Sequence, residues 1–122
     1  IRIGELLYGR DFAVSFDELG IYRLLLLLRD TDEAADFVEQ HLGKLLAWDQ
    51  AHGTDYLGTL AQIIRADWNL KEAAEKLYIH YNTMKNRYQK IWEICGVSRI
   101  NGEQKRNMEL AHKLLIVKGK TE

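Results

Sequence analysis

Amide side chains recur along one face of the segment over 80–95, and their chemistry suits the reading of DNA bases. The amides are Asn82, Asn86 and Gln89, and the carboxylate of Glu93 continues the same stripe. Their spacing of four, three and four residues aligns them on a helix that turns about 100° per residue. Amides can pair with base edges in the major groove, and the nearby Lys85 and Lys90 can contact phosphates. A merely solvated face more often carries Glu and Lys, which form helices better than Asn does. This amide stripe therefore favours a nucleic-acid reader over a solvated face.

Two helices joined by a short turn must position the amide stripe. Small and apolar residues at helical spacing predict a first helix over 70–77, and Asn69 can cap it in a capping box with Glu72. After a turn of about three residues, a second helix is expected over 80–95. Its apolar face lies opposite the amide stripe and comprises Met84, Tyr88, Ile91 and Cys95. This pattern over 69–96 is typical of a helix-turn-helix unit.

The composition indicates one all-α domain. The chain has 122 residues, of which 47% are apolar and 29% charged, as is ordinary for a single globular domain. It has no proline, and no segment shows the sustained alternation of apolar and polar residues that predicts a strand. We expect a compact bundle of about six to seven helices that contains the helix-turn-helix unit.

Charge is distributed unequally along the chain. Residues 1–64 hold 5 basic and 11 acidic side chains, whereas residues 65–122 hold 12 basic and 7 acidic ones. Neutralisation of phosphates supplies much of the affinity for nucleic acid, so only the C-terminal half is suited to contact DNA.

Capping residues and helix breakers predict the remaining helices. The first covers 19–28, and its candidate caps are Ser15 and Asp17. A capping box of Asp30 and Glu33 is expected to begin the next helix, and Gly43 is expected to end it.

Three more helices complete the expected set. A short helix over 45–52 ends before Gly53, and Thr54 caps another helix through Ile64. Asn101 caps a last helix that ends before Gly119.

The sequence gives no support to an enzyme, a metal site or a membrane span. It has no glycine-rich phosphate loop and no nucleotide fingerprint, so we expect neither catalysis nor a cofactor. The four histidines are not paired with Cys95 or with one another, so we expect no metal site. The apolar run over 20–28 is too short to span a membrane, and the single cysteine suits a reducing cytoplasm.

Four sequence blocks occur in a characteristic order. They lie at 18–25, at 42–46 with Asp49, at 56–60 and at 77–87, and the last contains His80-Tyr81-Asn82-Thr83. Together they resemble the C-terminal helix-turn-helix domain of the PucR/CdaR group of bacterial transcription regulators, which includes purine-catabolism and sugar-diacid regulators. The resemblance implies a DNA-binding output domain over 16–122, with 1–15 as a linker or the end of a preceding region. It also implies a sensing region before residue 1 that binds a small-molecule effector.

The amide stripe and the resemblance together identify the candidate DNA contacts. Asn82 and Thr83 match the start of the recognition helix of the family. The expected base contacts are Tyr81, Asn82, Lys85 and Asn86. The expected phosphate contacts are Lys71, His80, Thr83, Arg87, Gln89 and Lys90. A helix cap is an equal alternative for His80, and an internal ion pair is an equal alternative for Arg87.

The chain departs from the family at three of these positions. The family usually has Arg where this chain has Tyr81, and Arg and Tyr where it has Lys85 and Asn86. Lys cannot form the bidentate fork that Arg presents to guanine, whereas Asn can pair with adenine. We therefore expect a target sequence that differs from those of the family.

These observations predict sequence-specific binding of double-stranded DNA by the output domain of a cytoplasmic transcription regulator. The helix over 80–95 would enter the major groove, and two copies would bind symmetric half-sites as a homodimer or higher oligomer. The alternative is a helical module for protein interaction or self-association that does not read bases.

Overall fold

Residues 20–119 are described by the computed structural model, and they fold into six α-helices. The helices are α2 (Tyr22–Leu28), α3 (Asp32–His52), α4 (Tyr56–Arg65), α5 (Leu70–Leu77), α6 (Tyr81–Ile94) and α7 (Gly102–Gly119). No strand occurs within 20–119, so the all-α fold class is confirmed. The predicted caps Ser15 and Asp17 and the predicted linker over 1–15 lie outside the described residues.

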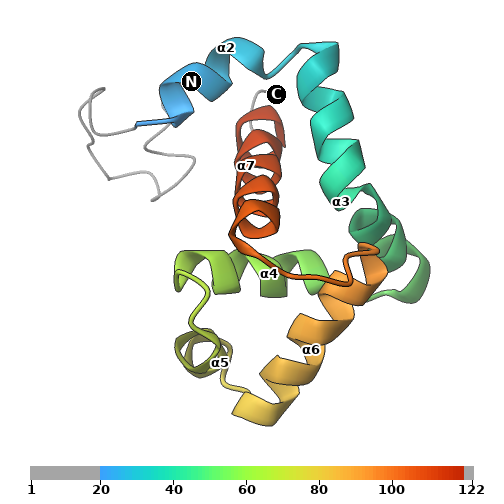
Figure 1. Ribbon diagram of the computed structural model, residues 1–122, viewed down its shortest axis with the longest axis vertical. Coiled ribbons are helices and arrows are strands. Elements are labelled where there is room, and N and C mark those ends of the chain that lie inside the picture. Colours follow the sequence, from blue (N-terminus) through green and yellow to red (C-terminus); the bar gives the residue numbers. More distant parts are fainter. Residues whose placement is uncertain (1–19, 120–122) are drawn as a thin grey trace.

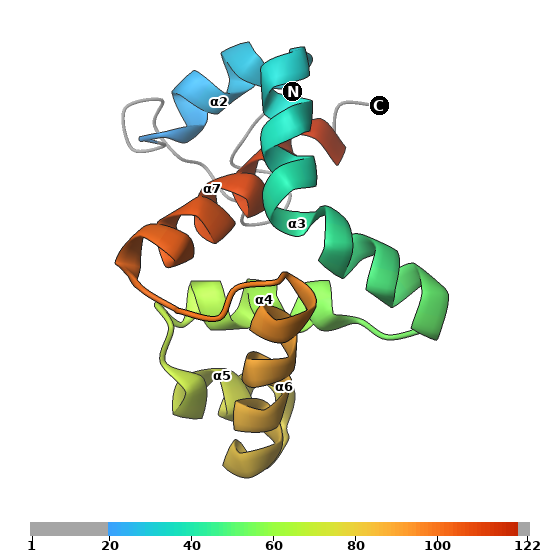
Figure 2. The ribbon, with the colours of Figure 1, turned by 45° about the vertical axis from the view of Figure 1, so that its right-hand side comes forward.

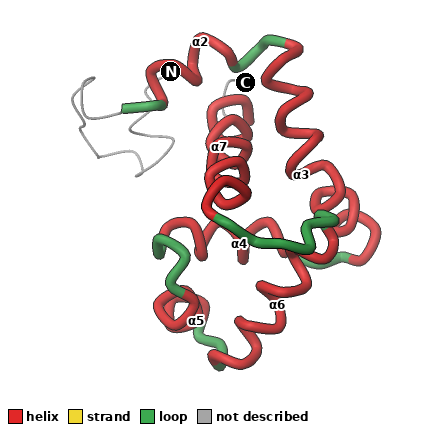
Figure 3. Tube along the Cα trace, viewed as in Figure 1, coloured by secondary structure: helices red, strands yellow, loops and turns green. Residues whose placement is uncertain are grey.

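The helices form two groups that α3 and α7 connect. Helices α4, α5 and α6 lie together at one end of the domain, and α2 lies at the other end (Figure 1, Figure 2). The larger apolar core joins α3 to the α4–α6 group and to the start of α7, and its largest buried side chains are Leu42, Leu45, Leu60, Ile63, Met84, Ile91, Trp92 and Met108. A smaller core of Leu25, Ala34, Leu114 and Val117 packs α2 and α3 against the end of α7. Short loops join the helices, and the longest leads from α6 to α7 (Figure 3).

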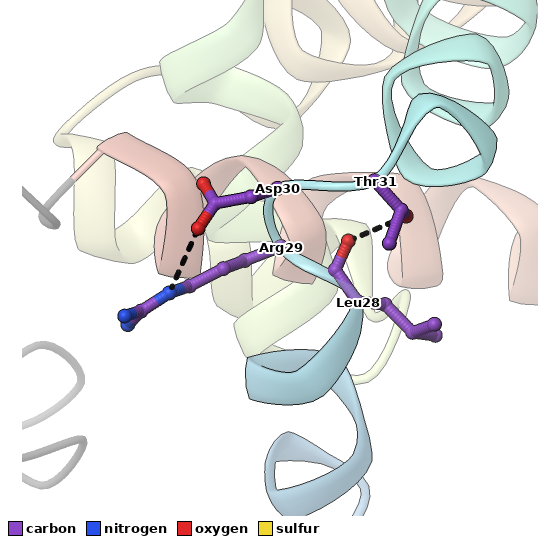
Figure 4. Close-up of polar contacts among 4 residues, drawn as sticks. All are labelled: Leu28, Arg29, Asp30 and Thr31. Atoms are coloured by element: carbon purple, nitrogen blue, oxygen red, sulfur yellow. Dashed lines mark hydrogen bonds and ion pairs between the residues drawn. The ribbon is translucent and has the colours of Figure 1, made fainter.

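Thr31, and not Asp30, caps α3. The Thr31 side chain accepts a hydrogen bond from the Ala34 amide, and its hydroxyl donates to the Leu28 carbonyl at 2.7 Å. The Asp30 carboxylate lies 3.6 Å from Nε of Arg29 instead (Figure 4). The predicted capping box of Asp30 and Glu33 is therefore wrong. Thr31 has the extended backbone that a cap requires, one residue later than predicted.

Gly43 does not end a helix. Helix α3 continues through it to His52, so the predicted boundary and the separate helix over 45–52 are both wrong. Gly43 is buried between Leu42 and Leu45, whose side chains are fully buried in the larger core. Burial of these leucines offsets the roughly 1 kcal/mol that glycine costs inside a helix. The helix ends at Gly53, as predicted, where a φ of 65° favours glycine.

Two carboxylates, and not Thr54, cap α4. Asp55 is the N-cap residue, and its side chain accepts a hydrogen bond from the Gly58 amide at 2.9 Å. The Asp49 carboxylate accepts hydrogen bonds from the first two amides of α4 at 2.8 and 2.9 Å. The Thr54 hydroxyl donates to the same carboxylate at 2.6 Å, so the predicted Thr54 cap is wrong. Asp49 reaches these groups because Gly53 turns the chain back toward the end of α3.

The last helix begins where the sequence predicts. Asn101 accepts a hydrogen bond from the Gln104 amide at 2.9 Å, and α7 then runs to Gly119. Among the helices of residues 20–119, none combines the length and the apolar character needed to cross a membrane.

Candidate nucleic-acid interface

Helix α5 begins at the predicted cap. The Asn69 side chain accepts a hydrogen bond from the Glu72 amide at 3.1 Å, which confirms this cap. The Asn69 amide donates to the Ala66 carbonyl, so the return contact of a capping box is not made. Ala73 and Ala74 are buried in the larger core, where α5 packs on α4 and α6. Their small side chains allow the close helix approach that the narrow apolar face predicts.

The turn between α5 and α6 contains one residue in the left-handed region. Tyr78 has a φ of 56°, and its amide donates to the Glu75 carbonyl at 3.2 Å. The next amide, of Ile79, donates to the Ala74 carbonyl at 3.0 Å. The Tyr78 side chain is 95% exposed. These hydrogen bonds end α5 and turn the chain into α6, which confirms the predicted helix-turn-helix geometry.

Helix α6 presents two different faces. Met84 and Ile91 are completely buried in the larger core, and Tyr88 and Cys95 are partly buried against it. The amide stripe is exposed at all four positions, namely the amides of Asn82, Asn86 and Gln89 and the carboxylate of Glu93. Burial of one face fixes the helix on the domain and leaves its amides accessible to a ligand.

The predicted DNA contacts are nearly all exposed. The exposed side chains are Lys71, His80, Tyr81, Asn82, Thr83, Lys85, Asn86 and Gln89, and the half-buried ones are Arg87 and Lys90. They come from the first turn of α5 and from α6 together with its cap. Both helices lie at the end of the domain opposite α2 (Figure 1).

His80 is the N-cap residue of α6. Its ring Nδ1 accepts a hydrogen bond from the Asn82 amide at 3.0 Å, and its backbone is extended. His80 therefore acts as the helix cap that was the alternative to a phosphate contact. Its contact with a phosphate stays a prediction.

Arg87 lies beside a groove between α4 and α6. The groove has a volume of about 770 Å³, and Arg65, Gln62, Asp55 and Ile79 also line it. Arg87 makes no ion pair with any residue of 20–119. The internal ion pair that was the alternative for its guanidinium is therefore not found among these residues.

Lys90 has an intramolecular partner on α3. Its Nζ lies 4.6 Å from the centroid of the Trp48 ring, and His52 stacks on the same ring at a centroid distance of 3.8 Å. Attraction between the ammonium and the ring accounts for the position of Lys90 without DNA. Its role as a phosphate contact stays a prediction.

Tyr81 brings together two lysines from different helices. Lys85 Nζ lies 5.5 Å and Lys71 Nζ lies 5.9 Å from the centroid of the Tyr81 ring. The sequence identifies all three side chains as candidate contacts but does not indicate that they meet.

Helix α7 fixes the helix-turn-helix unit through Trp68. The Trp68 indole Nε1 donates to the Glu109 carboxylate at 2.7 Å, and its ring centroid lies 6.0 Å from that of Trp92. These contacts hold Trp68 at a φ of 67°, a conformation that is costly for a bulky side chain. Trp68 therefore lies at the seam between α7 and the helix-turn-helix unit. Glu109 was not predicted, because no local pattern links residues that lie 41 positions apart.

Burial controls the ionisation of two groups close to this unit. Burial lowers the pKa of His112 in α7 to about 4, and the positive charges of Arg65 and Lys113 lower it further. Burial raises the pKa of the Cys95 thiol to about 11, and Lys44 opposes that effect. Cys95 is therefore protonated at neutral pH and packs as a small apolar side chain, as its place on the apolar face of α6 predicts.

Comparison with known proteins links this geometry to one family. Residues 56–114 match the PucR C-terminal helix-turn-helix domain. This range begins at the first residue of α4, includes α5 and α6, and ends within α7. No solved structure matches the chain.

Two curated proteins of Bacillus subtilis (strain 168) are similar to the chain. The DNA-binding transcriptional activator AdeR is 36% identical over 100 residues, which are 82% of this chain and 24% of AdeR. The proline-responsive transcriptional activator PutR is 31% identical over 87 residues, which are 71% of this chain and 21% of PutR. The chain thus spans less than a quarter of the length of either relative. The family match and the two relatives agree with the α4–α6 geometry, and the chain belongs to the PucR C-terminal helix-turn-helix domain family.

Proposed function

We propose that the chain binds double-stranded DNA in a sequence-specific manner and acts as the output domain of a transcription regulator. The observation that carries this proposal is the exposed amide stripe on α6, opposite the buried Met84 and Ile91. AdeR is named a DNA-binding activator, and its similarity to this chain supports the same function here. Both relatives are named as transcriptional activators and neither as an enzyme, which supports a role in binding without catalysis.

The proposed docking places the start of α6 in the major groove. Helix α6 has 14 residues and is about 21 Å long, so its first half covers only a few base pairs. Asn82 and Asn86 are the principal base contacts, because each exposed amide can pair with an adenine edge. Thr83, Gln89 and Arg87 contact phosphates, together with the positive end of the helix at His80. Lys90 joins these contacts if its ammonium leaves Trp48.

Salt dependence and an alanine substitution test this proposal together. Affinity for a mixed-sequence duplex should fall steeply between about 50 mM and 200 mM salt, since each phosphate contact adds about −0.9 to the logarithmic slope. Asn86→Ala should leave the slope unchanged and lower discrimination at one base pair by about 1–3 kcal/mol. Gln50→Ala is the matched control, because Gln50 is an exposed amide on α3 outside the unit. Fluorescence anisotropy measures both quantities, and an absence of duplex binding at the lowest salt contradicts the proposal.

An apolar face on α2 supports self-association of two copies. Leu24 and Leu27 are 62% and 79% exposed, and Ile21 and Leu28 are exposed beside them. The three-and-four spacing of Ile21, Leu24 and Leu28 is that of helices that pair lengthwise. A helix of seven residues offers far less than the roughly 800 Å² per partner of a stable interface. The two copies therefore pair weakly and add their pairing energy when both bind one duplex.

Leu27→Glu separates this self-association from base reading. The variant should lose cooperative binding to a duplex with two half-sites and keep the affinity for a single half-site. If cooperativity is unchanged, α2 is not the interface between the copies.

The same face of α2 favours the second candidate function, a self-association module that does not read bases. That function requires a chain that self-associates without DNA and binds no duplex. Analytical ultracentrifugation measures the self-association, and fluorescence anisotropy measures the binding of duplex.

The remaining parts of the regulator lie outside the described residues. PutR is named as proline-responsive. We propose that another region of this regulator likewise senses a small-molecule effector. The proposed division is a linker or preceding region over 1–15 and the DNA-binding domain over 16–122. A regulator of this kind acts in the bacterial cytoplasm, where the chromosome lies.

A further inference from the structure

A ring at the start of α6 lies beneath two ammonium groups that belong to different helices. Lys85 follows Tyr81 by one turn of α6, and its Nζ lies 5.5 Å from the Tyr81 ring centroid. Lys71 comes from the first turn of α5, and its Nζ lies 5.9 Å from the same centroid. The Tyr81 ring therefore links the start of the recognition helix to the start of the helix before it.

We propose that Tyr81 is a positioning residue that acts through these lysines. Its ring holds the ammonium groups of Lys71 and Lys85 beside the amide stripe, where both neutralise phosphates of the duplex that α6 reads. This inference rests on the proposed DNA-binding function. It replaces the predicted base contacts of Tyr81 and Lys85 with a role in the electrostatic part of binding.

The direction of the Tyr81 side chain argues against base reading. At about 100° per residue, Tyr81 lies about 100° to 140° around α6 from Asn82 and Asn86. It lies close to the direction of Tyr88, which packs on the larger core. Tyr81 itself is only 37% exposed, so the rest of its surface is covered by the domain. A partly covered ring on this side of α6 is suited to hold neighbouring side chains rather than to reach a base edge.

The position of Lys71 supplies a second argument. Lys71 stands in the first turn of α5, where the helix dipole disfavours a cation. Attraction to the Tyr81 ring and to a phosphate both offset this cost. An exposed lysine also loses conformational freedom when it binds, and a contact that already restricts its side chain reduces that loss. The ring therefore strengthens phosphate binding while the two lysines keep their charge.

A double-mutant cycle on the 122-residue chain tests this role. The probe is a fluorescein-labelled duplex of random sequence at low salt, so that the measurement reports phosphate contacts. Tyr81→Leu removes the ring and should weaken binding about twofold to fivefold. Tyr81→Phe keeps the ring and should bind as the wild type does. When Lys71→Met and Lys85→Met are both present, Tyr81→Leu should change the affinity by less than about twofold.

Two outcomes of the cycle overturn the inference. An equal loss from Tyr81→Leu in both backgrounds means that the ring contacts DNA directly. A loss in Tyr81→Phe that equals the loss in Tyr81→Leu means that the hydroxyl, and not the ring, is responsible. If the wild-type chain binds no duplex, the proposed DNA-binding function fails together with this inference. If the chain binds DNA and the affinity does not depend on Tyr81, only this inference fails.

A measurement without DNA tests the ring contact itself. The ε-methylene protons of Lys71 and Lys85 should show ring-current shifts in the NMR spectrum of the wild type. The shifts should persist in Tyr81→Phe and disappear in Tyr81→Leu. Thermal unfolding of each variant shows whether it is folded. Lysine resonances that are the same in all three proteins contradict the inference, whatever the result with DNA.

Discussion

Acidification should destabilise the domain through His112. The folded state holds this side chain neutral, because burial and two neighbouring cations lower its pKa from 6.5 to about 4. The unfolded chain binds the proton more readily between these values, so stability is fully present above the unfolded pKa and is lost as the pH falls toward 4. At about 1.4 kcal/mol per pH unit the gap corresponds to about 3 kcal/mol, and partial contact with solvent reduces the expected loss to about 2 kcal/mol.

Urea unfolding at two pH values measures this loss. Between about pH 7.5 and pH 5 most carboxylates stay ionised, and we expect the free energy of unfolding to fall by about 1–2 kcal/mol. His112→Gln cannot titrate, so most of this fall should disappear. A small remainder should come from His41, whose pKa burial also lowers. At the higher pH His112 is neutral in both states, so the difference in free energy of unfolding between the wild type and His112→Gln gives the packing cost of the substitution alone. A variant that loses as much stability as the wild type over this range refutes the reasoning.

Three substitutions test the contacts that position the helix-turn-helix unit. Asn69→Ala removes the cap of α5 and should lower the free energy of unfolding by about 1 kcal/mol in urea titration. Asn69→Asp keeps an acceptor, so equal losses in both variants would argue against capping. Leu60→Ala should cost about 2–5 kcal/mol in thermal unfolding because Leu60 is fully buried, and a loss below 1 kcal/mol would contradict the assigned core. Glu109→Ala leaves the Trp68 indole without its acceptor and should cost about 1–3 kcal/mol by the same assay, whereas Glu109→Gln should cost less.

The helix-turn-helix unit is predictable from sequence because its signals are local. These signals are the cap at Asn69, the small residues on one face of α5 and the opposite faces of α6. Each signal depends on residues that lie about one helix turn apart. The amide stripe is exposed for the same reason, since burial of Met84 and Ile91 turns it outward.

The errors occur where a local signal competes with tertiary packing. Gly43 is a helix breaker in isolation, but the leucines beside it gain more from burial than the glycine costs. Asp30 and Thr31 are both good caps, and the exact path of the chain between α2 and α3 selects Thr31.

Contacts between distant segments leave no trace in a single sequence. The hydrogen bond from Trp68 to Glu109 and the meeting of Lys71 with Tyr81 depend on how whole helices pack. The candidate site is therefore predictable as a set of residues, whereas the way in which these residues act together follows only from the structure.

Selection from a random pool of duplexes tests whether α6 reads DNA bases. The chain is joined to a second copy through an artificial dimerisation helix, and bound duplexes are sequenced after several rounds at low salt. If α6 reads bases, a two-fold symmetric site with adenines in each half should be enriched, and Asn82→Ala or Asn86→Ala should relax the choice at separate positions. A pool that stays random although the chain binds it would mean that α6 does not read bases.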